Sequence, residues 1–558
     1  MIQLEKRNQD TVLLVDGKPF IMLAGEVHNS DSSSPTYMEG IWDIAEGLGM
    51  NTLLLPVTWE MVEPEQGTFD FSVPQKLIEQ ARAREMHIVF LWFGSWKNAE
   101  CMYAPAWVKK DTETYKRAEI VKGQKKAGRR VSAQMPVQIP YYSLSYLCEA
   151  TCKADAKAFA ALMTFLKDFD EKEQTVLAVQ VENETGLLGA AREVSDEADA
   201  AFAARVPQDF VDYMRAHTET MVDDVRASVE NGAASGTWSE VFGENAEEIF
   251  SAYYVSSYVN AVAAAGKAIY PLPLAANCWL NKPDDTPGFY PSGGPVSRVH
   301  EVWDFCAPAI DVYCPDIYVS YFDDVCKEYV RRGNPLFIPE SATHSYCAPR
   351  LVYTVGHYHA MCYSPFGFDD IGKPFTATQG YLFGMDVTDP ALKTPQNFAE
   401  YGKLGSILKS MMPLLGDAYG TDRLQAVSAE ASGAAKLAGL SMQEMMKLMM
   451  TGQVTQPVMH FGDVNVTARL TSPMQPRTDG VLLALKVADD ELYLVGNACS
   501  IDLASANADA PNLDLLLVEE GTFKDNTWCP GRRFNGDETA TFSFEAPGVY
   551  HVKYFTYK

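Results

Sequence analysis

The chain has 558 residues, 47% of them apolar, and a formal net charge of −27. At roughly 100–200 residues per domain, this length predicts two or three domains. A surface this acidic repels nucleic-acid phosphates and anionic lipids. The charge therefore argues against nucleic acid and membrane partners. It suits a neutral or cationic small substrate, although an acidic surface also serves solubility alone.

The beginning of the chain and its cysteines favour a reducing compartment. Residues 1–17 contain no basic stretch followed by an apolar core, so no secretory signal is predicted. No run approaches the roughly 18 apolar residues of a membrane span. The eleven cysteines show no zinc-type pairs, and Cys148 and Cys152 lie closest in sequence. We therefore expect reduced thiols, no structural disulfides and a cytoplasmic location.

Short apolar strands alternate with amphipathic helices over the first three quarters of the chain. Asp16-Gly17 predicts a tight hairpin turn within residues 11–23, and the second apolar run leads into residues 24–29. Further strands are predicted at 51–59, 87–96, 175–184, 272–279, 311–318, 335–341 and 361–368. Helices are predicted at 39–50, 73–86, 159–169, 208–230, 243–267, 297–306 and 395–411. Eight such strands predict an α/β fold, a (β/α)₈ TIM barrel over residues 1–420, with its site at the carboxyl ends of the strands.

The C-terminal part has a different character. Residues 434–450 predict a linker helix, whose Met-rich end we interpret as packing material rather than a cofactor site. Short alternating strands follow, at 480–487, 491–497, 513–520, 539–546 and 548–558. Residues 421–558 therefore predict a linker helix and a C-terminal β-sandwich accessory domain.

Residues 103–147 interrupt the alternation with a basic segment. Their positive charges could form a lid or a partner patch, but a solvated hairpin explains them more simply. The basic residues are Lys109, Lys110, Lys116, Arg117, Lys122, Lys125, Lys126, Arg129 and Arg130.

Two strand ends carry acidic residues that suit catalysis. Val179–Glu184 ends the fourth predicted strand and Phe337–Ser341 ends the seventh, so Glu184 and Glu340 should point into the same barrel mouth. An isolated acidic strand end is common, but this pair, with Asn183 before Glu184, is far more specific. Glycoside hydrolysis needs one carboxyl group to protonate the leaving oxygen and another to attack the anomeric carbon. Two such neighbours do not both ionise readily, so one keeps its proton and serves as the acid.

Several segments resemble glycoside hydrolase family 35, the β-galactosidases. NTLLLPVTWEMVEPEQGTFDF resembles the family's second-strand signature and NAECMYAPAWV its third-strand segment. VQVENETG resembles the acid/base motif and IPES the nucleophile motif. The segment before Tyr318 resembles a smaller bacterial subgroup with one C-terminal sandwich. Departures are GEVHN at the first strand, Glu60 in place of an Asn, and Thr185 where a Tyr is common.

The resemblance implies a role for each matching residue. Glu184 becomes the acid/base and Glu340 the nucleophile. Asn98 and Glu100 are expected to bond sugar hydroxyls, Asn183 the 2-hydroxyl, and Tyr318 the nucleophile. A flat apolar ring can also cover the C–H face of a pyranose. Further expected substrate-binding residues are Glu26, Asn29, Trp59, Glu60, Trp279 and Phe368.

These observations predict a retaining, exo-acting glycoside hydrolase that releases terminal β-galactose from an oligosaccharide or glycoside. Transglycosylation, a β-glycosidase of other sugar specificity, and a non-catalytic carbohydrate-binding protein stay open. No cofactor is expected, since no P-loop, dinucleotide fingerprint or G-x-S-x-G occurs. No metal is expected either: His357 and His359 would share a strand face, but no third ligand follows. A homo-oligomer is left open.

Overall fold

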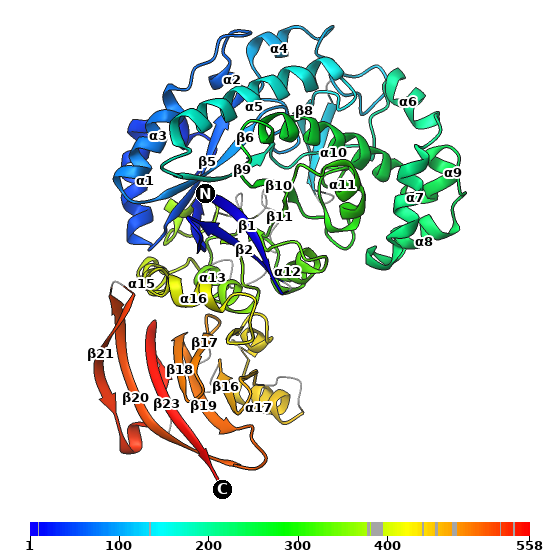
Figure 1. Cartoon of the computed structure of the whole chain (residues 1–558). Helices are drawn as coiled ribbons and strands as arrows, with labels where there is room; N and C mark the ends of the chain where they lie inside the picture. The colour runs from blue at the N-terminus through cyan, green and yellow to red at the C-terminus, as the bar shows by residue number, and fades with distance from the viewer. Residues whose placement is uncertain are drawn as a thin grey trace.

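The computed structural model describes residues 1–8, 10–125, 127–132, 135–376, 380, 394–437, 440–451, 456–470, 477–524, 526–539 and 542–558. Figure 1 shows a large part built of strands and surrounding helices, coloured blue to yellow, and a smaller C-terminal part of long antiparallel strands in orange and red.

An N-terminal hairpin precedes the barrel. Strands β1 (Ile2–Arg7), β2 (Asp10–Val15) and β3 (Lys18–Pro19) form an antiparallel sheet. Leu14 pairs with Pro19 and Val15 with Lys18. Asp16 and Gly17 between them have φ of 50° and 73°, the left-handed values that a two-residue hairpin turn of this kind requires. The predicted turn is therefore confirmed.

Eight parallel strands form the barrel. In chain order they are β4 (Met22–Glu26), β5 (Thr52–Thr58), β6 (His87–Phe93), β9 (Val176–Val181), β10 (Leu274–Trp279), β11 (Val312–Asp316), β12 (Phe337–Ile338) and β13 (Cys362–Tyr363). Their order in the sheet is β11-β10-β9-β6-β5-β4-β13-β12. A parallel bridge between Ile317 and Ser341 closes the ring, and the Ile317 N–H donates to the Glu340 carbonyl at 2.9 Å. The predicted (β/α)₈ barrel is confirmed, and β9 and β12 are its fourth and seventh strands.

Helices cover the outside of the sheet, as Figure 1 shows. The long helices α5 (Glu149–Asp170) and α10 (Ala246–Lys267) pack against each other. Helix α5 buries Phe159, Leu162 and Leu166, the stripe that its sequence spacing predicts. The others are α1 (Pro35–Gly47), α2 (Trp59–Val62), α3 (Ser72–Ala83), α4 (Ala106–Lys110), α11 (His300–Cys306), α12 (Phe322–Val330), α13 (Cys347–His357), α15 (Phe398–Ser410) and α16 (Met412–Ala418).

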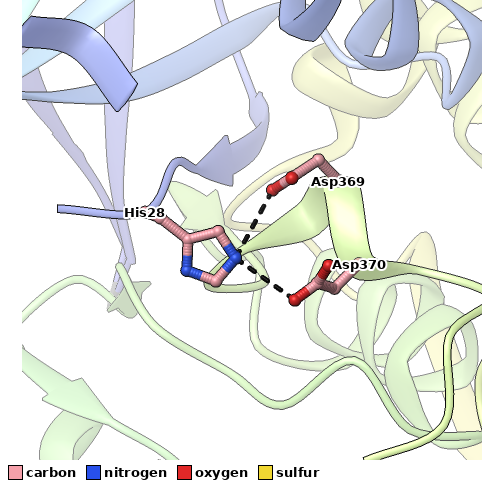
Figure 2. Close-up of side chains that lie close together, drawn as sticks. All are labelled: His28, Asp369 and Asp370. Carbon is pink, nitrogen blue, oxygen red and sulfur yellow. Dashed lines mark hydrogen bonds and ion pairs between the residues drawn. The ribbon is translucent and has the colours of Figure 1, made fainter. Parts of the chain in front are cut away.

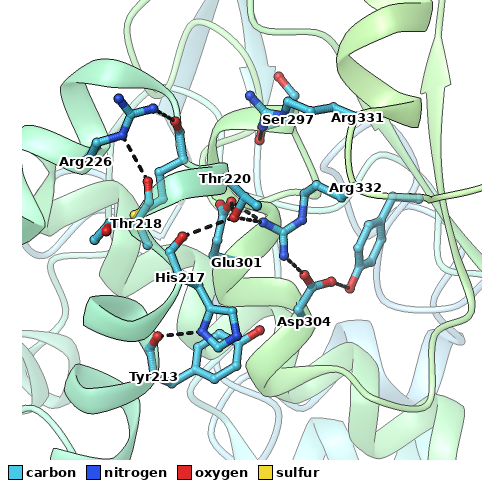
Figure 3. Close-up of polar contacts among 12 residues, drawn as sticks. Tyr213, His217, Thr218, Thr220, Arg226, Ser297, Glu301, Asp304, Arg331 and Arg332 are labelled. Atoms are coloured by element: carbon cyan, nitrogen blue, oxygen red, sulfur yellow. Dashed lines mark hydrogen bonds and ion pairs between the residues drawn. The ribbon is translucent and has the colours of Figure 1, made fainter.

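Four short helices form an insertion between β9 and β10: α6 (Asp196–Ala203), α7 (Gln208–Ala216), α8 (Asp223–Asn231) and α9 (Trp238–Phe242). The single helix predicted at 208–230 is therefore wrong, because a 3-10 turn at Thr218–Thr220 separates α7 from α8. Arg332 ties this insertion to the barrel helices (Figure 3). Its guanidinium donates to Glu301 and Asp304 of α11 and to Thr220.

The basic segment contains an antiparallel hairpin, β7 (Ala127–Ser132) with β8 (Met135–Tyr141). This agrees with the hairpin of the simpler interpretation. Lys126 lies outside the described residues.

Two antiparallel sheets form the C-terminal part. The order of the larger is β14 (Leu424–Ser428), β17 (Val481–Ala488), β18 (Glu491–Asn497), β23 (Gly548–Tyr557), β20 (Asn512–Lys524), β21 (Thr527–Phe534). The smaller joins β15 (Val458–His460), β16 (Val464–Arg469), β19 (Cys499–Ser505) and β22 (Ser543–Phe544). An apolar cluster that includes Val466, Leu494 and Val552 draws on both sheets, as the predicted sandwich requires.

The linker helix differs from its prediction. A 3-10 turn at Ala434–Leu437 and helix α17 (Met442–Met450) occupy the predicted range, and residues 438 and 439 lie outside the described residues. Residues 540 and 541 of the predicted strand 539–546 also lie outside them. The division of the chain between residues 420 and 421 stays a prediction.

Within the described ranges, no helix has both the length and the apolar content that crossing a bilayer would require. The eleven cysteines are all unpaired.

Candidate active site

The end of the fourth strand is held in an unusual backbone conformation. Glu182 and Glu184 have φ of 65° and 46°, and Asn98 and Ala99 on the facing loop have φ of 53° and 59°. Non-glycine residues rarely adopt such values, and strain of this kind concentrates at functional sites. The Trp96 N–H donates to Glu182 Oε2 at 2.8 Å and so joins the two loops.

A second buried acid, Asp155, forms hydrogen bonds to the end of the third strand and the loop that follows it. Asp155 of α5 accepts hydrogen bonds from Trp92 Nε1 at 2.9 Å and from the Ser95 hydroxyl at 2.6 Å. Burial and the adjacent Asp155 carboxylate raise the pKa of Glu182 well above its usual range. The two buried acids therefore repel each other when both are ionised, and this repulsion is one cause of the raised pKa of Glu182.

Glu340 follows the seventh strand and faces the same mouth. Its residue surface is 4% exposed, and the Tyr318 hydroxyl donates to Glu340 Oε2 at 2.6 Å. Tyr318 follows β11, the sixth strand, so neighbouring strand ends orient the carboxylate. The predicted contact between Tyr318 and Glu340 is present.

The carboxyl groups of the two strand ends lie close together. One carboxylate oxygen each from Glu184, Glu340 and Asp316 lie within 4.8 Å of one another. Burial, and then the charge of Glu340, raise the pKa of Glu184 to about 7. Burial, Glu340 and Glu184 likewise raise the pKa of Asp316 well above its usual range. Glu184 can therefore hold a proton near neutral pH.

Lys97 supplies positive charge to this acidic site. Its ammonium is buried and donates to Asn183 Oδ1 at 2.9 Å. Burial lowers the pKa of Lys97, but the carboxylates of Glu340 and Glu184 outweigh burial and hold it above its usual range. Lys97 therefore stays charged and lowers the pKa of Glu184 toward the working range.

Glu26, at the end of the first strand, is a third glutamate in the site. It is completely buried, and burial followed by Glu340 raises its pKa well above the usual range. Lys97 opposes this shift. The predicted position of Glu26 in the pocket agrees with these neighbours.

Several buried polar atoms of the described site residues have no hydrogen-bond partner within the protein. They include both carboxylate oxygens of Glu26, Oε1 of Glu340, Oδ1 of Asp316 and Nδ2 of Asn183. Buried polar groups in folded proteins are almost always paired, so unmatched ones that gather at one place point to a polar ligand. A sugar, with a hydroxyl on nearly every carbon, can pair several of them at once.

Asn98 and Glu100 lie on the loop after the third strand. The Asn98 amide donates to Glu184 Oε2 at 2.5 Å, so it contacts the predicted acid/base. Glu100 pairs with Lys97 through both backbone groups. Trp279 ends the fifth strand and packs, partly exposed, with Ala99 and Leu188.

Four predicted residues are placed differently from the sugar contacts expected of them. Trp59 and Phe368 have no exposed surface: Trp59 packs edge-on against Trp107 and bonds Glu63, and Phe368 packs against Gly25. Asn29 and Glu60 line a different cavity of about 210 Å³ between the loops after the first two strands, and Lys109 bonds Glu60 at 3.1 Å.

Sequence reasoning missed Lys97, Asp316 and Asn277. Asn277 Oδ1 accepts from the Glu184 N–H at 3.0 Å, and its amide donates to Asp316 Oδ2 at 2.9 Å. Both Asn277 and Asp316 lie in apolar strands, and a polar residue inside a fully buried strand was the signal available.

The sequence expectation that His357 and His359 share one face rested on a strand in this stretch. His357 instead ends helix α13, and His359 Nδ1 faces Asp10 at 2.5 Å. The three acids Glu184, Asp316 and Glu340 are near enough to share an ion, but Lys97 beside them already supplies a cation.

The fold and the site define the class: a (β/α)₈-barrel protein with a buried carboxyl cluster at the ends of its fourth and seventh strands. Residues 12–125 match the family model described as Glycosyl hydrolases family 35, which confirms the resemblance over that segment. Residues 403–544 match a model described as Domain of unknown function (DUF5597).

Individual relatives are more distant. A beta-galactosidase of Xanthomonas manihotis is 33% identical over 84 residues, and the match covers 14% of either chain. The beta-galactosidase structure from Bacillus circulans sp. alkalophilus is 14% identical, with a TM-score of 0.44 over 71% of this chain and 57% of that one. A catalytic mutant of a family 42 beta-galactosidase from G. stearothermophilus is 11% identical, with a TM-score of 0.46 over 96% and 98%.

Proposed function

We propose that the protein is a retaining, exo-acting β-galactosidase. One observation carries the mechanism: carboxylate oxygens of Glu184 and Glu340 lie within 4.8 Å of each other. Retaining glycosidases keep their two carboxyl groups about 5–5.5 Å apart, whereas inverting enzymes leave about 6.5–9.5 Å for a water molecule. This spacing supports double displacement.

In the first step, Glu340 attacks the anomeric carbon and the bond to the leaving oxygen breaks. Glu184 gives its proton to that oxygen, so the aglycone leaves as a neutral alcohol. The Tyr318 hydroxyl holds the Glu340 carboxylate in place at 2.6 Å. Glu340 is then an ester and has lost its charge.

In the second step, Glu184 takes a proton from water, which attacks the same carbon and releases Glu340. The loss of the Glu340 charge lowers the pKa of Glu184, because that charge is one of the causes that raise it. The same side chain is thus an acid in one step and a base in the next. The sugar is released with its original anomeric configuration.

The unmatched polar atoms support a sugar in this place. The side-chain oxygen of Asn183 accepts from Lys97, and its side-chain nitrogen has no hydrogen-bond partner. That nitrogen suits a bond to the 2-hydroxyl. Glu26 offers two buried oxygens that could accept from neighbouring hydroxyls. Trp279 offers a partly exposed ring at the strand end.

Galactose as the sugar rests on the family 35 match and on the printed name of the Xanthomonas manihotis relative. We also propose that residues 1–420 form the catalytic barrel and 421–558 the accessory part. The eleven unpaired thiols support our proposal of a reducing, cytoplasmic location.

A panel of matched aryl β-glycosides tests the proposal: galactoside, glucoside, fucoside and arabinoside. We expect the largest kcat/KM for the galactoside. A site built around the axial 4-hydroxyl loses about 1–3 kcal/mol per unmatched bond with glucose, or roughly ten- to hundredfold. A preference for another sugar would contradict the galactose assignment alone. If none of the four glycosides were hydrolysed, the proposed enzymatic activity would be contradicted. A sugar acceptor in the same assay separates hydrolysis from transglycosylation.

A further inference from the structure

A second cluster of charged groups lies at the rim of the barrel mouth. His28 follows the first strand, and Asp369 and Asp370 lie in the 3-10 turn Phe368–Asp370 that follows the eighth. Figure 2 shows the His28 ring pointing its Nε2 atom between the two carboxylates. One ligand-type atom from each of the three lies within 4.8 Å of the other two.

His28 Nε2 forms an ion-pair contact with each aspartate, and these two distances also suit ligands that share one centre. His28 Nε2 lies 3.2 Å from Asp370 Oδ2 and 3.7 Å from Asp369 Oδ1, and the second distance is too long for a hydrogen bond. Ligands about 2.1 Å from one tetrahedral ion lie about 3.4 Å apart. The observed separations bracket that value.

One atom of the cluster has an ion-pair contact but no hydrogen bond. Asp369 Oδ1 is buried, and no hydrogen-bond donor within the described protein reaches it. The other oxygen of Asp370, Oδ1, accepts from the Lys373 ammonium at 2.7 Å. Its Oδ2 therefore stays directed at His28.

The residues around the cluster are mostly acidic. Asp31 accepts from the backbone N–H of His28 through Oδ2 at 3.1 Å, which adds a third carboxylate to this loop. Lys373 is the positive partner that the structure describes for Asp370 besides His28. Acidic side chains therefore outnumber basic ones around His28, which suits a bound cation.

The backbone holds these groups together. Gly367 has φ of 59°, and its N–H donates to the Glu26 carbonyl at 2.8 Å, so the first and eighth strand ends are bonded side by side. A Cβ atom at Gly367 would lie 2.5 Å from the His28 ring. Glycine is therefore needed for the ring to reach its place. A cavity of about 170 Å³, lined in part by His28, Gly367 and Asp370, gives access.

We propose that His28, Asp369 and Asp370 bind one divalent transition-metal ion, manganese or zinc, that fastens the loops after the first and eighth strands. One imidazole and two carboxylates suit these ions, whereas magnesium and calcium prefer oxygen ligands alone. The ligands stand about 340 residues apart, so no spacing motif reveals them. The site is separate from the catalytic pair and does not depend on the proposed activity.

The test is direct binding to the full-length protein after chelator treatment and dialysis. Mn²⁺ is the probe, because the protein's thiols favour zinc over it. Titration calorimetry should show one saturable Mn²⁺ site, bound at least tenfold more tightly than Mg²⁺ or Ca²⁺. His28→Ala and Asp369→Asn should each weaken it at least tenfold, with unchanged circular dichroism. His217→Ala, a histidine of the helical insertion, should bind as the original protein does.

Two results would overturn the proposal. One is the lack of saturable Mn²⁺ binding up to millimolar concentration. The other is binding that survives both His28→Ala and Asp369→Asn but is lost in Glu340→Gln. That result would place the ion at Glu184, Asp316 and Glu340 instead. A rise in the melting temperature with Mn²⁺ that both rim variants lose would give independent support.

Discussion

The Lys97 ammonium donates to the Asn183 side-chain oxygen at 2.9 Å and thereby links the loops after the third and fourth strands. The same charge lowers the pKa of Glu184. One buried cation therefore both orients a predicted sugar contact and sets the acidity of the predicted acid.

Lys97→Met should change the pH profile as well as the rate. Without the positive charge the pKa of Glu184 rises, so the fall of kcat/KM at high pH should move to higher pH. Loss of the Asn183 contact should lower kcat/KM by about 100-fold. The comparison is Lys76→Met, an exposed lysine paired with Glu79. A lower rate with an unmoved pH profile would show that Lys97 only supports structure.

Glu340→Gln and Glu184→Gln should separate the two catalytic roles. Glu340→Gln should lower kcat at least about 10⁴-fold for every substrate, because no ester can form. Glu184→Gln should cost about 10²- to 10⁴-fold with a poor alcohol leaving group, but far less in the first step with an activated aryl group. Pre-steady-state measurement with both substrates gives the answer. Equal losses on the two would argue against Glu184 as the acid.

The raised pKa of Glu184 also predicts an effect on stability. The folded value is about 7, above the ordinary 4.5, so the folded protein keeps a proton that the unfolded chain loses. The contribution of Glu184 to stability is therefore fully present below about pH 4.5 and is lost as pH rises through about 7, a difference of about 3 kcal/mol. Glu184→Gln removes that loss and should unfold at higher denaturant concentration at pH 8 but not at pH 4.5.

Glu193 offers a matched control. Burial raises the pKa of Glu193 to about 7 as well, and its carboxylate accepts from Ser145 at 2.7 Å. Glu193→Gln should show the same pH-dependent gain in stability while keeping full activity. If Glu193→Gln lost activity as Glu184→Gln does, a raised pKa would not distinguish the two sites.

Arg350 and Glu430 form a buried, two-bonded ion pair. Arg350 of α13 donates to Glu430 at 2.9 and 2.6 Å and is 1% exposed. Glu430→Ala should lower the free energy of unfolding by about 3–5 kcal/mol, since it leaves a buried charge unpaired. Arg350 also contacts Ser341, next to Glu340, at 3.4 Å. Arg350→Met with Glu430→Met should recover most of the stability, and denaturant unfolding measures both. If Glu430→Ala lowered the free energy of unfolding by less than about 1 kcal/mol, the Arg350–Glu430 ion pair would not be buried as described.

The barrel was predictable because alternating period-2 and period-3.6 patterns mark each strand and helix. The predicted Glu26, Asn183, Glu184, Tyr318 and Glu340 gather at one mouth because strand ends of a barrel meet there. Lys97 was not predictable, since a lone lysine in a sequence is normally exposed. Its burial depends on carboxylates contributed by four other strand ends.

Other differences also come from long-range packing. Trp59 and Phe368 were expected to cover a sugar, but aromatic side chains at strand ends pack inward wherever apolar neighbours surround them. Strands β14 and β16 were missed, and they pair with β17 and β19, which lie far along the chain. Strand β21 was missed although it forms a hairpin with the strand before it, β20. The predicted β-sandwich was recovered from its five most alternating segments.

The stereochemistry of hydrolysis tests the central claim most directly. Proton NMR of an aryl β-galactoside should show β-galactose as the first product, with the α anomer appearing later by mutarotation. Glu340→Gln should form neither at a measurable rate. α-Galactose as the first product would contradict the double displacement by Glu340 and Glu184, and no galactose from the intact protein would contradict the proposed enzyme itself.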